Sequence, residues 1–206
     1  MTAIRTLESS VESGLNVFAA NTFVIQKNPE FNFGRDRRKY RNRKNITYEQ
    51  YKKLKNRSKL PLLVGPVDGT STRNVHYKGE KLKNNVDLFG GDEGTIRFYN
   101  TFLADGRNFI NDDIHFSRNV CVLGMDVVDQ LFPFEDPIRK KIKIDGLGYH
   151  VIGITERQGE AFGESKDNYI GIPITTFIEK FSNDWSSIRI HICLLYTSPS
   201  PRDGTS

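Results

Sequence analysis

The segment 120–156 constrains the fold of this chain more than any other stretch. Residues 120–123 form a short apolar run that ends at Gly124, which is typical of a strand buried on both faces. Four apolar residues then recur at helical spacing: Val127, Val128, Leu131 and Phe132. Pro133 ends this expected helix, because its ring cannot continue the hydrogen-bond ladder. The first half of the segment therefore predicts a buried strand followed by a short helix.

The second half of the same segment predicts a β-hairpin. Asp136 and Pro137 mark a turn, after which isoleucines at 142 and 144 alternate with lysines at 141 and 143. This alternation gives a strand with one buried and one exposed face. Asp145-Gly146 is a two-residue hairpin signal that leads into a second strand over residues 147–154. Together the two halves predict a compact β-rich core.

The motifs of this segment resemble those of the periplasmic core domain of MacB-like ABC transporter permeases. The matching strings are V-L-G from Val122, L-F-P-x-x-D-P-I from Leu131, and K-I-K-I-x-G-x-x-Y-x-V-I-G-I from Lys141. Shorter motifs agree on either side: G-R-x-F at 106–109 followed by Asp112-Asp113, F-G at 162–163, D-N at 167–168 and I-P at 172–173. Arg139 departs from the pattern, because the family usually has glycine after Pro-Ile. The resemblance extends over residues 9–192.

The resemblance implies an α+β fold with two lobes, a mixed α/β lobe near the membrane and an inserted, mostly β lobe. Residues 1–20 would be a stalk helix that continues from a transmembrane helix preceding Met1. Residues 21–192 would be the core domain, incomplete at its C-terminal end. The spacing of apolar residues at 4, 7, 11 and 15 also predicts an amphipathic helix over residues 2–16. No run in the chain approaches the ~20 apolar residues that cross a bilayer.

The resemblance also implies a function and a location. The chain would be the extracytoplasmic domain of a permease subunit in the cell inner (plasma) membrane, facing the periplasm. It would transmit ATP-driven conformational change for efflux or for the export of lipoproteins or other substrates. The implied partners are a cytoplasmic ABC ATPase subunit, a second permease subunit in a dimer and, in some members, a periplasmic adaptor and an outer-membrane channel. ATP would bind to the ATPase subunit, so no cofactor is expected in this chain.

The rest of the chain predicts further strands and helices. Strands are expected over residues 21–26, 60–67, 72–77, 86–90 and 168–172, with a last one through Ile188, Ile190 and Ile192. Turns are expected at Asp68-Gly69 and Lys78-Gly79, and a polar loop over residues 156–166. Thr47 is expected to cap a helix that ends near Arg57, and Pro173 to open a helix over residues 174–181.

The last fourteen residues, CLLYTSPSPRDGTS, differ in character from the chain before them. Residues 193–206 have no periodicity and contain two Ser-Pro steps. They resemble translated adaptor sequence, so we set them aside as a non-native tail and exclude them from the fold prediction.

Positive charge is concentrated near the N-terminus. The first 60 residues hold fourteen Lys and Arg against five acidic residues, whereas the remainder is net negative. Six side chains in a predicted loop over residues 28–45 are candidate contacts for a partner or for lipid: Arg35, Arg37, Arg38, Arg41, Arg43 and Lys44. Such a loop is most often a solvated surface, but it also fits an acidic partner or anionic headgroups. The alternative function is a basic nucleic-acid-binding module, in which these cations neutralise phosphates and Tyr40 stacks on a base.

No residues in the sequence have the spacing of a catalytic or metal site. The histidines lie far apart and none forms a helical metal pair: His76, His115, His150 and His191. Asp112-Asp113 fits a capped acidic turn better than catalytic carboxylates, because adjacent side chains point apart. Gly90-Gly91 and Gly94 are spaced like a phosphate-binding loop, but the acidic pair between them would repel an anion. The two cysteines, Cys121 and Cys193, are expected to be free thiols. The chain is therefore expected not to be an enzyme.

Overall fold

A computed structural model describes residues 22–28, 42–58, 61–72, 74–99, 101–161, 163–183 and 186–194. The helix expected over residues 2–16, most of the basic segment and the tail beyond residue 194 lie outside these described residues. Among the helices within them, none is long and apolar enough to cross a bilayer.

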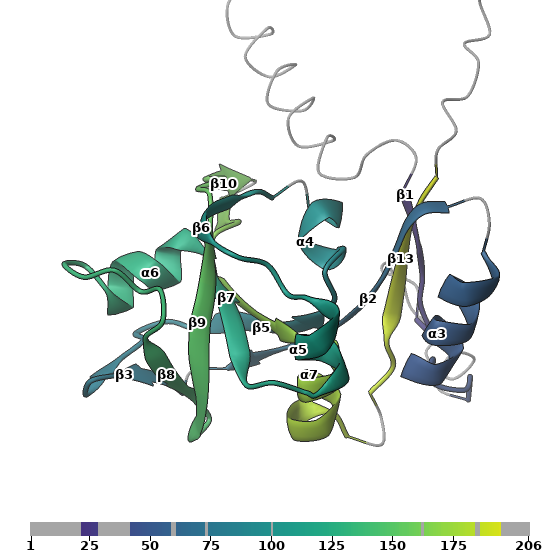
Figure 1. Cartoon of the computed structure of the whole chain (residues 1–206), viewed down its shortest axis with the longest axis horizontal. Helices are drawn as coiled ribbons and strands as arrows, with labels where there is room; N and C mark the ends of the chain where they lie inside the picture. The colour runs from purple at the N-terminus through teal and green to yellow at the C-terminus, as the bar shows by residue number, and fades with distance from the viewer. Residues whose placement is uncertain are drawn as a thin grey trace, which may run out of the picture.

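The described residues form one large mixed sheet with short helices packed beside it (Figure 1). The sheet has eleven strands, ten of which follow one path: β1 (Thr22–Ile25), β13 (Arg189–Leu194), β2 (Pro61–Thr72), β5 (Val86–Gly91), β12 (Tyr169–Pro173), β7 (Val120–Leu123), β9 (Leu147–Thr155), β8 (Lys141–Ile144), β3 (Val75–Tyr77) and β4 (Glu80–Lys81). β6 (Leu103–Gly106) pairs with β9 off this path. The pairs β5–β12 and β7–β9 are parallel, whereas the others are antiparallel. This mixed architecture confirms the α+β class.

Five helices lie in the described part of the chain: α3 (Tyr48–Arg57), α4 (Thr95–Phe98), α5 (Asn111–His115), α6 (Met125–Leu131) and α7 (Ile174–Phe181). α3 begins as expected, because the Gln50 N–H donates to Thr47 Oγ1 at 3.3 Å and the Thr47 N–H donates to Gln50 Oε1 at 3.0 Å. α7 follows Pro173 directly, also as expected. The segment expected to be a polar loop instead contains a small hairpin of β10 (Glu160–Ala161) and β11 (Glu164–Ser165).

Strand β2 is longer than expected, because Asp68-Gly69 does not form a turn. Residues 61–67 of β2 pair with β13, and residues 68–72 pair with β5. Asp-Gly favours a turn only where the chain is free to reverse. Here hydrogen bonding to two different neighbours holds the backbone extended through both residues, so the local signal is overridden. The Lys78-Gly79 turn is confirmed, with φ angles of 45° and 93°.

The sheet carries two lobes (Figure 1), and the small one has a hydrophobic core separate from the two clusters of the larger lobe. The small lobe contains α3, β1, β13 and the first half of β2, and its core is formed by Tyr51, Val64, Ile188, Ile190 and Ile192. β13 continues to Leu194, so the sheet includes the first two residues of the segment that we set aside as a tail. The larger lobe contains the other strands and helices. Because β2 belongs to both, one continuous strand joins the lobes.

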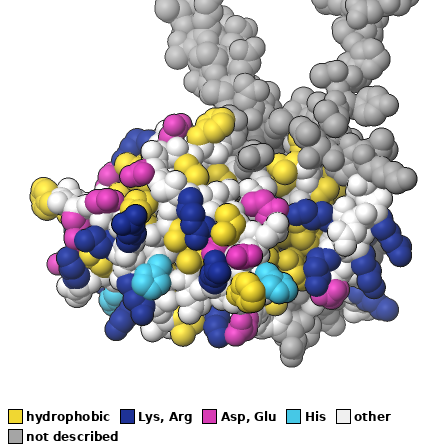
Figure 2. All heavy atoms as spheres, viewed as in Figure 1, with side chains coloured by type: hydrophobic (Ala, Val, Ile, Leu, Met, Phe, Trp, Pro, Cys, Tyr) yellow, Lys and Arg dark blue, Asp and Glu magenta, His cyan; other side chains and the backbone are white. Residues whose placement is uncertain are grey.

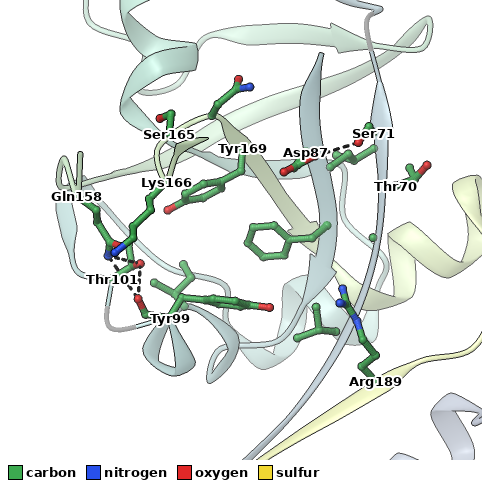
Figure 3. Close-up of a pocket in the computed structure, with 16 residues that line it drawn as sticks. Thr70, Ser71, Asp87, Tyr99, Thr101, Gln158, Ser165, Lys166, Tyr169 and Arg189 are labelled. Atoms are coloured by element: carbon green, nitrogen blue, oxygen red, sulfur yellow. Dashed lines mark hydrogen bonds between the residues drawn. The ribbon is translucent and has the colours of Figure 1, made fainter. Parts of the chain in front are cut away.

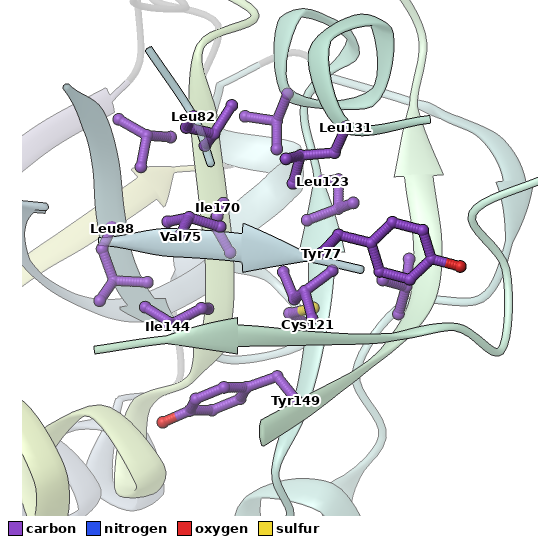
Figure 4. Close-up of a cluster of buried hydrophobic side chains, with 14 of the residues drawn as sticks. Val75, Tyr77, Leu82, Leu88, Cys121, Leu123, Leu131, Ile144, Tyr149 and Ile170 are labelled. Carbon is purple, nitrogen blue, oxygen red and sulfur yellow. The ribbon is translucent and has the colours of Figure 1, made fainter. Parts of the chain in front are cut away.

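The main core lies in the larger lobe, on the segments that the sequence singled out (Figure 4). All four residues of β7 are buried, and the two isoleucines of β8 are buried while its lysines are exposed. Val127 and Leu131 of α6 pack onto this core. Asp145 and Gly146, with φ angles of 48° and 83°, form the expected hairpin turn. Cys121 is a free thiol in the same core, and burial raises its pKa.

The turn between α6 and β8 contains the residue that departs from the family pattern. The Asp136 carboxylate accepts a hydrogen bond from the Ile138 N–H at 2.8 Å. Arg139 then adopts a φ of 66°, a left-handed conformation that costs a non-glycine residue about 1–2 kcal/mol. Its N–H donates to the Val151 carbonyl at 2.8 Å, so the turn keeps its pairing to β9 without a glycine.

Candidate functional site

Two of the six candidate basic residues lie in the described part of the chain. Arg43 donates from its guanidinium to the backbone carbonyl of Lys27 at 3.4 Å, just beyond β1, and Lys44 is exposed. The other four lie outside the described residues: Arg35, Arg37, Arg38 and Arg41. On the described surface in Figure 2, Lys and Arg side chains are scattered among acidic ones. Contact of the basic cluster with a partner or with lipid therefore stays a prediction.

The Asp112-Asp113 pair forms a capped turn, as the sequence predicts. Asp113 is fully buried and accepts hydrogen bonds from the Ile110 N–H at 3.1 Å, from Arg107 at 2.6 Å and from Arg118 at 3.2 Å. Burial alone would raise the pKa of Asp113, but hydrogen bonds from Arg107 and Ile110 outweigh it and hold the pKa below its usual range. The Asp112 side chain is 63% exposed. The two carboxylates therefore stabilise a turn and do not face one another.

A cavity of about 470 Å³ opens on one face of the sheet, where β2, β5 and β12 run side by side (Figure 3). Two rows of paired residues cross these strands on that face: Ser71, Asp87 and Tyr169, and next to them Gly69, Phe89 and Gly171. The residues between them, such as Leu88 and Ile170, point to the opposite face and belong to the main core. The sheet therefore separates the cavity from the core.

Two glycines make room for the cavity. A Cβ added to Gly171 would lie 3.0 Å from Phe89 Cζ, so the Phe89 ring extends over this glycine. A Cβ added to Gly69 would lie 3.6 Å from Phe89 Cβ and 3.8 Å from Arg189 Nη2. The Arg189 side chain therefore reaches over Gly69 from β13. A side chain at Gly171 would push the Phe89 ring away from the sheet, and a side chain at Gly69 would enter the space between Phe89 and Arg189.

Aromatic rings form the walls around this floor. The Phe89 ring centroid lies 5.5 Å from that of Tyr169 and 6.3 Å from that of Tyr99. Tyr99 follows α4, which also contributes Ile96 to the lining. Such ring separations fall within the range of favourable aromatic contacts. The apolar part of the cavity thus has three rings drawn from three different segments.

The loop that carries Gln158 and Lys166 closes one end of the cavity (Figure 3). The buried Asp167 carboxylate accepts from the Gln158 N–H at 2.9 Å and from the Gly159 N–H at 2.8 Å. The Gln158 side chain donates to Thr101 Oγ1 at 2.5 Å. These bonds fix the loop against the segment that follows α4.

The charged side chains that line the cavity are one acid and two cations. Asp87 accepts a hydrogen bond from Ser71 Oγ at 2.9 Å. Neither Lys166 nor Arg189 forms an ion pair within 4 Å with any of the residues that the structure describes. Burial raises the pKa of Tyr99, with Arg189 acting in the opposite direction, so this phenol is a neutral donor at pH 7. The lining can therefore hold an organic molecule.

Sequence reasoning did not find this cavity. Its lining comes from β2, β5, β11, β12, β13 and the segment after α4, which are far apart in the sequence. The interpretation of Asp68-Gly69 as a turn also hid the pairing of Gly69 with Phe89. The only signal in the sequence is that a glycine pairs with an aromatic residue on the neighbouring strand. This pairing can be recognised only once the register of the two strands is known. Among the described residues, no group of His, Cys, Asp and Glu is arranged to hold a metal ion.

Comparisons with known proteins agree with the fold. The sequence model described as "MacB-like periplasmic core domain" matches residues 1–201. The chain is 30% identical over 112 residues to the macrolide export ATP-binding/permease protein MacB of Chlorobium phaeobacteroides. The aligned region covers 54% of this chain and 16% of that relative. The chain thus spans less than a fifth of this relative's length.

Two solved structures share the architecture. The periplasmic region of MacB from Actinobacillus actinomycetemcomitans superimposes with a TM-score of 0.71 at 20% identity, covering 90% of this chain and 80% of that one. The extracellular domain of the ABC-type transporter YknZ from Gram-positive bacteria superimposes with a TM-score of 0.61 at 19% identity, covering 74% and 75%. At these identities the likeness establishes the fold alone.

Proposed function

The chain belongs to the family of MacB-like periplasmic core domains, and from this premise we propose that it is the extracytoplasmic domain of an ABC transporter permease subunit. It would face the periplasm at the inner membrane. The proposal assigns no chemical step to the domain, because ATP hydrolysis would belong to a cytoplasmic ATPase subunit. The domain would instead move as a rigid body and transmit conformational change during export of a substrate.

The pairing of β1 with β13 is the observation that carries this proposal. Thr22 pairs with Cys193 in an antiparallel ladder, so the two ends of the described chain lie side by side at one edge of the sheet (Figure 1). A domain inserted between two membrane segments needs this arrangement, because both connections must return to one surface. The chain that leads into β1 would then run toward the membrane.

The links between the lobes support a mechanical role. β2 is continuous through both lobes, and the Tyr51 hydroxyl of the small lobe donates to the Asp92 carboxylate of the larger lobe at 2.5 Å. Force applied at β1 and β13 would therefore reach the larger lobe with little internal deformation. We also propose a second permease copy as the partner in a dimer, and a periplasmic adaptor and an outer-membrane channel where the system performs efflux.

The test requires the complete permease that contains this domain, reconstituted in lipid nanodiscs with its ATPase subunit. A spin label on Lys143→Cys, an exposed position on β8, reports the distance between the two copies of the domain by pulsed electron paramagnetic resonance. Cys121 is buried, and its raised pKa makes it unreactive toward the label. We expect the distance distribution to differ between the nucleotide-free and ATP-bound states.

The matched control is an ATPase subunit that binds ATP but cannot hydrolyse it. With this subunit, the label should remain in the ATP-bound distribution for as long as ATP is present, because none of it is hydrolysed. A distance distribution that is identical in all nucleotide states would refute the transmission role. Absence of the protein from the membrane fraction would refute the permease assignment itself.

A further inference from the structure

We propose that the cavity between β2, β5 and β12 binds a small amphiphilic organic anion, a flat apolar ring system that carries a carboxylate. The apolar body would lie on the Phe89 ring, and the carboxylate would accept hydrogen bonds from Arg189. This inference is independent of the permease assignment, because it rests only on the side chains that line the cavity.

The size and the floor of the cavity fit a flat apolar body. A volume of about 470 Å³ accommodates a molecule of two or more fused rings. The floor is the Phe89 ring, which lies over Gly171 because this glycine has no side chain beneath the ring, and Gly69 leaves the space between Phe89 and Arg189 open. Rings of a ligand placed on Phe89 would also contact Tyr99 and Tyr169, whose centroids lie 6.3 Å and 5.5 Å from Phe89. Stacking among aromatic rings adds to the free energy of apolar burial.

The charges of the lining favour an anion. Arg189 and Lys166 have no ion-pair partner within 4 Å among the described residues, so both cations are available to a ligand. Arginine is suited to a carboxylate because its planar fork can donate two parallel hydrogen bonds. Figure 3 shows the Tyr99 hydroxyl pointing toward the Arg189 side chain, where it can add a further donor. Burial raises the pKa of Asp68, and the nearby charge of Arg189 only partly opposes this, so the two residues form no close ion pair.

A cationic ligand is the main alternative, because three aromatic rings can also surround an ammonium group. The two unpaired cations of the lining would repel such a ligand. The single lining acid, Asp87, already accepts a hydrogen bond from Ser71 at 2.9 Å. A neutral ring compound would gain the stacking and forgo the charged hydrogen bonds. Comparing the affinities of an anionic, a neutral and a cationic ring compound therefore distinguishes the proposed anion site from these two alternatives.

The experiment uses the purified chain and three probes that share a naphthalene ring and carry a negative, a neutral or a positive polar group: 2-naphthoate, 2-naphthamide and 2-(aminomethyl)naphthalene. Isothermal titration calorimetry measures the affinity, and amide chemical shifts measured by NMR locate the site. We expect naphthoate to bind about tenfold more tightly than naphthamide, which corresponds to about 1.4 kcal/mol from charged hydrogen bonds. The aminomethyl compound should bind most weakly. The largest shifts should occur around Gly69, Phe89 and Tyr169.

Three variants separate the contributions of charge and space. Arg189→Gln should remove most of the preference for naphthoate over naphthamide. Lys143→Gln, which removes an exposed cation from β8 outside the cavity, should leave the affinity unchanged. Gly69→Val adds a β-branched side chain at the floor and should abolish binding of both compounds. The thermal melting of each variant is measured to establish that it is folded.

Equal affinity of folded wild-type protein for naphthoate and naphthamide would overturn the assignment of an anion. Tighter binding of the aminomethyl compound would replace it with a cation site. Shifts confined to residues outside the cavity, or unchanged naphthoate affinity in folded Gly69→Val, would overturn the site itself.

Discussion

The hydroxyl of Tyr51 connects the two lobes through one buried carboxylate. Asp92 is 2% exposed and accepts hydrogen bonds from Tyr51 at 2.5 Å, from the Gly94 N–H at 3.0 Å and from Thr95 Oγ1 at 3.2 Å. Burial raises the pKa of Tyr51, and the charge of Asp92 raises it further, so the hydroxyl remains protonated as a donor. Asp92 thereby fixes both α3 and the turn before α4.

Tyr51→Phe should lower the free energy of unfolding by about 1–2 kcal/mol, because the buried Asp92 carboxylate loses one donor. Urea denaturation measured by circular dichroism checks this value. Tyr48→Phe is the matched control, since Tyr48 stacks on Tyr51 at 5.5 Å and its hydroxyl has no hydrogen-bond partner within the described residues. Its loss should stay below about 0.5 kcal/mol. Equal losses in both variants would show that the Asp92 contact contributes nothing.

Arg139→Gly should stabilise the protein by about 0.5–1 kcal/mol. Arg139 has a φ of 66°, and glycine relieves this left-handed strain, although its greater freedom in the unfolded chain offsets part of the gain. Thermal or urea unfolding measures the difference. The neighbouring Lys140→Gly, at a residue without positive φ, should destabilise instead. Destabilisation by Arg139→Gly would mean that its side chain makes a larger contribution than the backbone strain.

His191 makes stability depend on pH. It is 5% exposed, its Nε2 has no hydrogen-bond partner among the residues that the structure describes, and its ring centroid lies 5.6 Å from that of Phe98 and 5.7 Å from that of Tyr99. Burial, assisted by the charge of Arg189, lowers its pKa from 6.5 to about 4. A histidine whose pKa is lower in the folded state contributes full stability above the unfolded pKa. That contribution is lost as the pH falls from about 6.5 toward 4.

Lowering the pH from 7.5 to 5 should therefore cost the wild-type protein about 2 kcal/mol more than it costs His191→Phe. Urea unfolding of both proteins at the two pH values gives this difference. Phenylalanine keeps a ring in the aromatic cluster and has no proton to bind, so the comparison cancels other groups that titrate in the same interval. An identical pH dependence in the two proteins would exclude His191 as its source.

At the scale of elements, close packing of α7 on β5 depends on a glycine. A Cβ added to Gly90 would lie 2.4 Å from Phe177 Cβ. This atom is bonded directly to the helix backbone and cannot move unless the helix moves. The helix therefore rests directly on the strand at this point. Ile172 of β12, paired with Gly90, supplies the neighbouring side chain of the same core.

Gly90→Ala should destabilise the protein by about 2–3 kcal/mol, because α7 has to move away from the sheet to accept the added methyl group. Gly69→Ala is the control, since its nearest contact, the Leu88 carbonyl oxygen, would lie at an ordinary 3.4 Å. That variant should change the free energy of unfolding by less than about 0.5 kcal/mol. Denaturant unfolding of both variants tests the contrast. Similar stabilities would indicate that α7 adjusts without cost.

Elements whose signals are local could be predicted from the sequence. The Thr47 cap and the proline before α7 correctly predicted two helices, and the alternating isoleucines of β8 correctly predicted its buried face. Asp68-Gly69 was wrong as a turn because its conformation depends on two strands that are distant in the sequence. The hairpin of β10 and β11 was missed for the opposite reason, since its strands have two residues each and show no periodicity.

At the scale of the whole molecule, the fold class could be predicted, but the cavity could not. The α+β class was implied by the resemblance to MacB-like periplasmic core domains, whose longest matching motifs lie around β7 to β9. The cavity requires the register of β5 with β2 and with β12, which sets Phe89 between Gly69 and Gly171. Neither pairing can be predicted from the sequence of a single strand. A site built across several strands therefore becomes visible only once the sheet is assembled.

The pairing of β1 with β13 also has a consequence for the order of folding. Thr22 pairs with Cys193, so the first strand described meets a partner at the opposite end of the chain. The cost of loop closure grows with the length of chain between partners. The hairpin of β8 and β9 has its partners two residues apart and closes at low cost. The larger lobe should consequently acquire hydrogen-exchange protection first, and β1 should be the last strand to join, after its partner has left the ribosome.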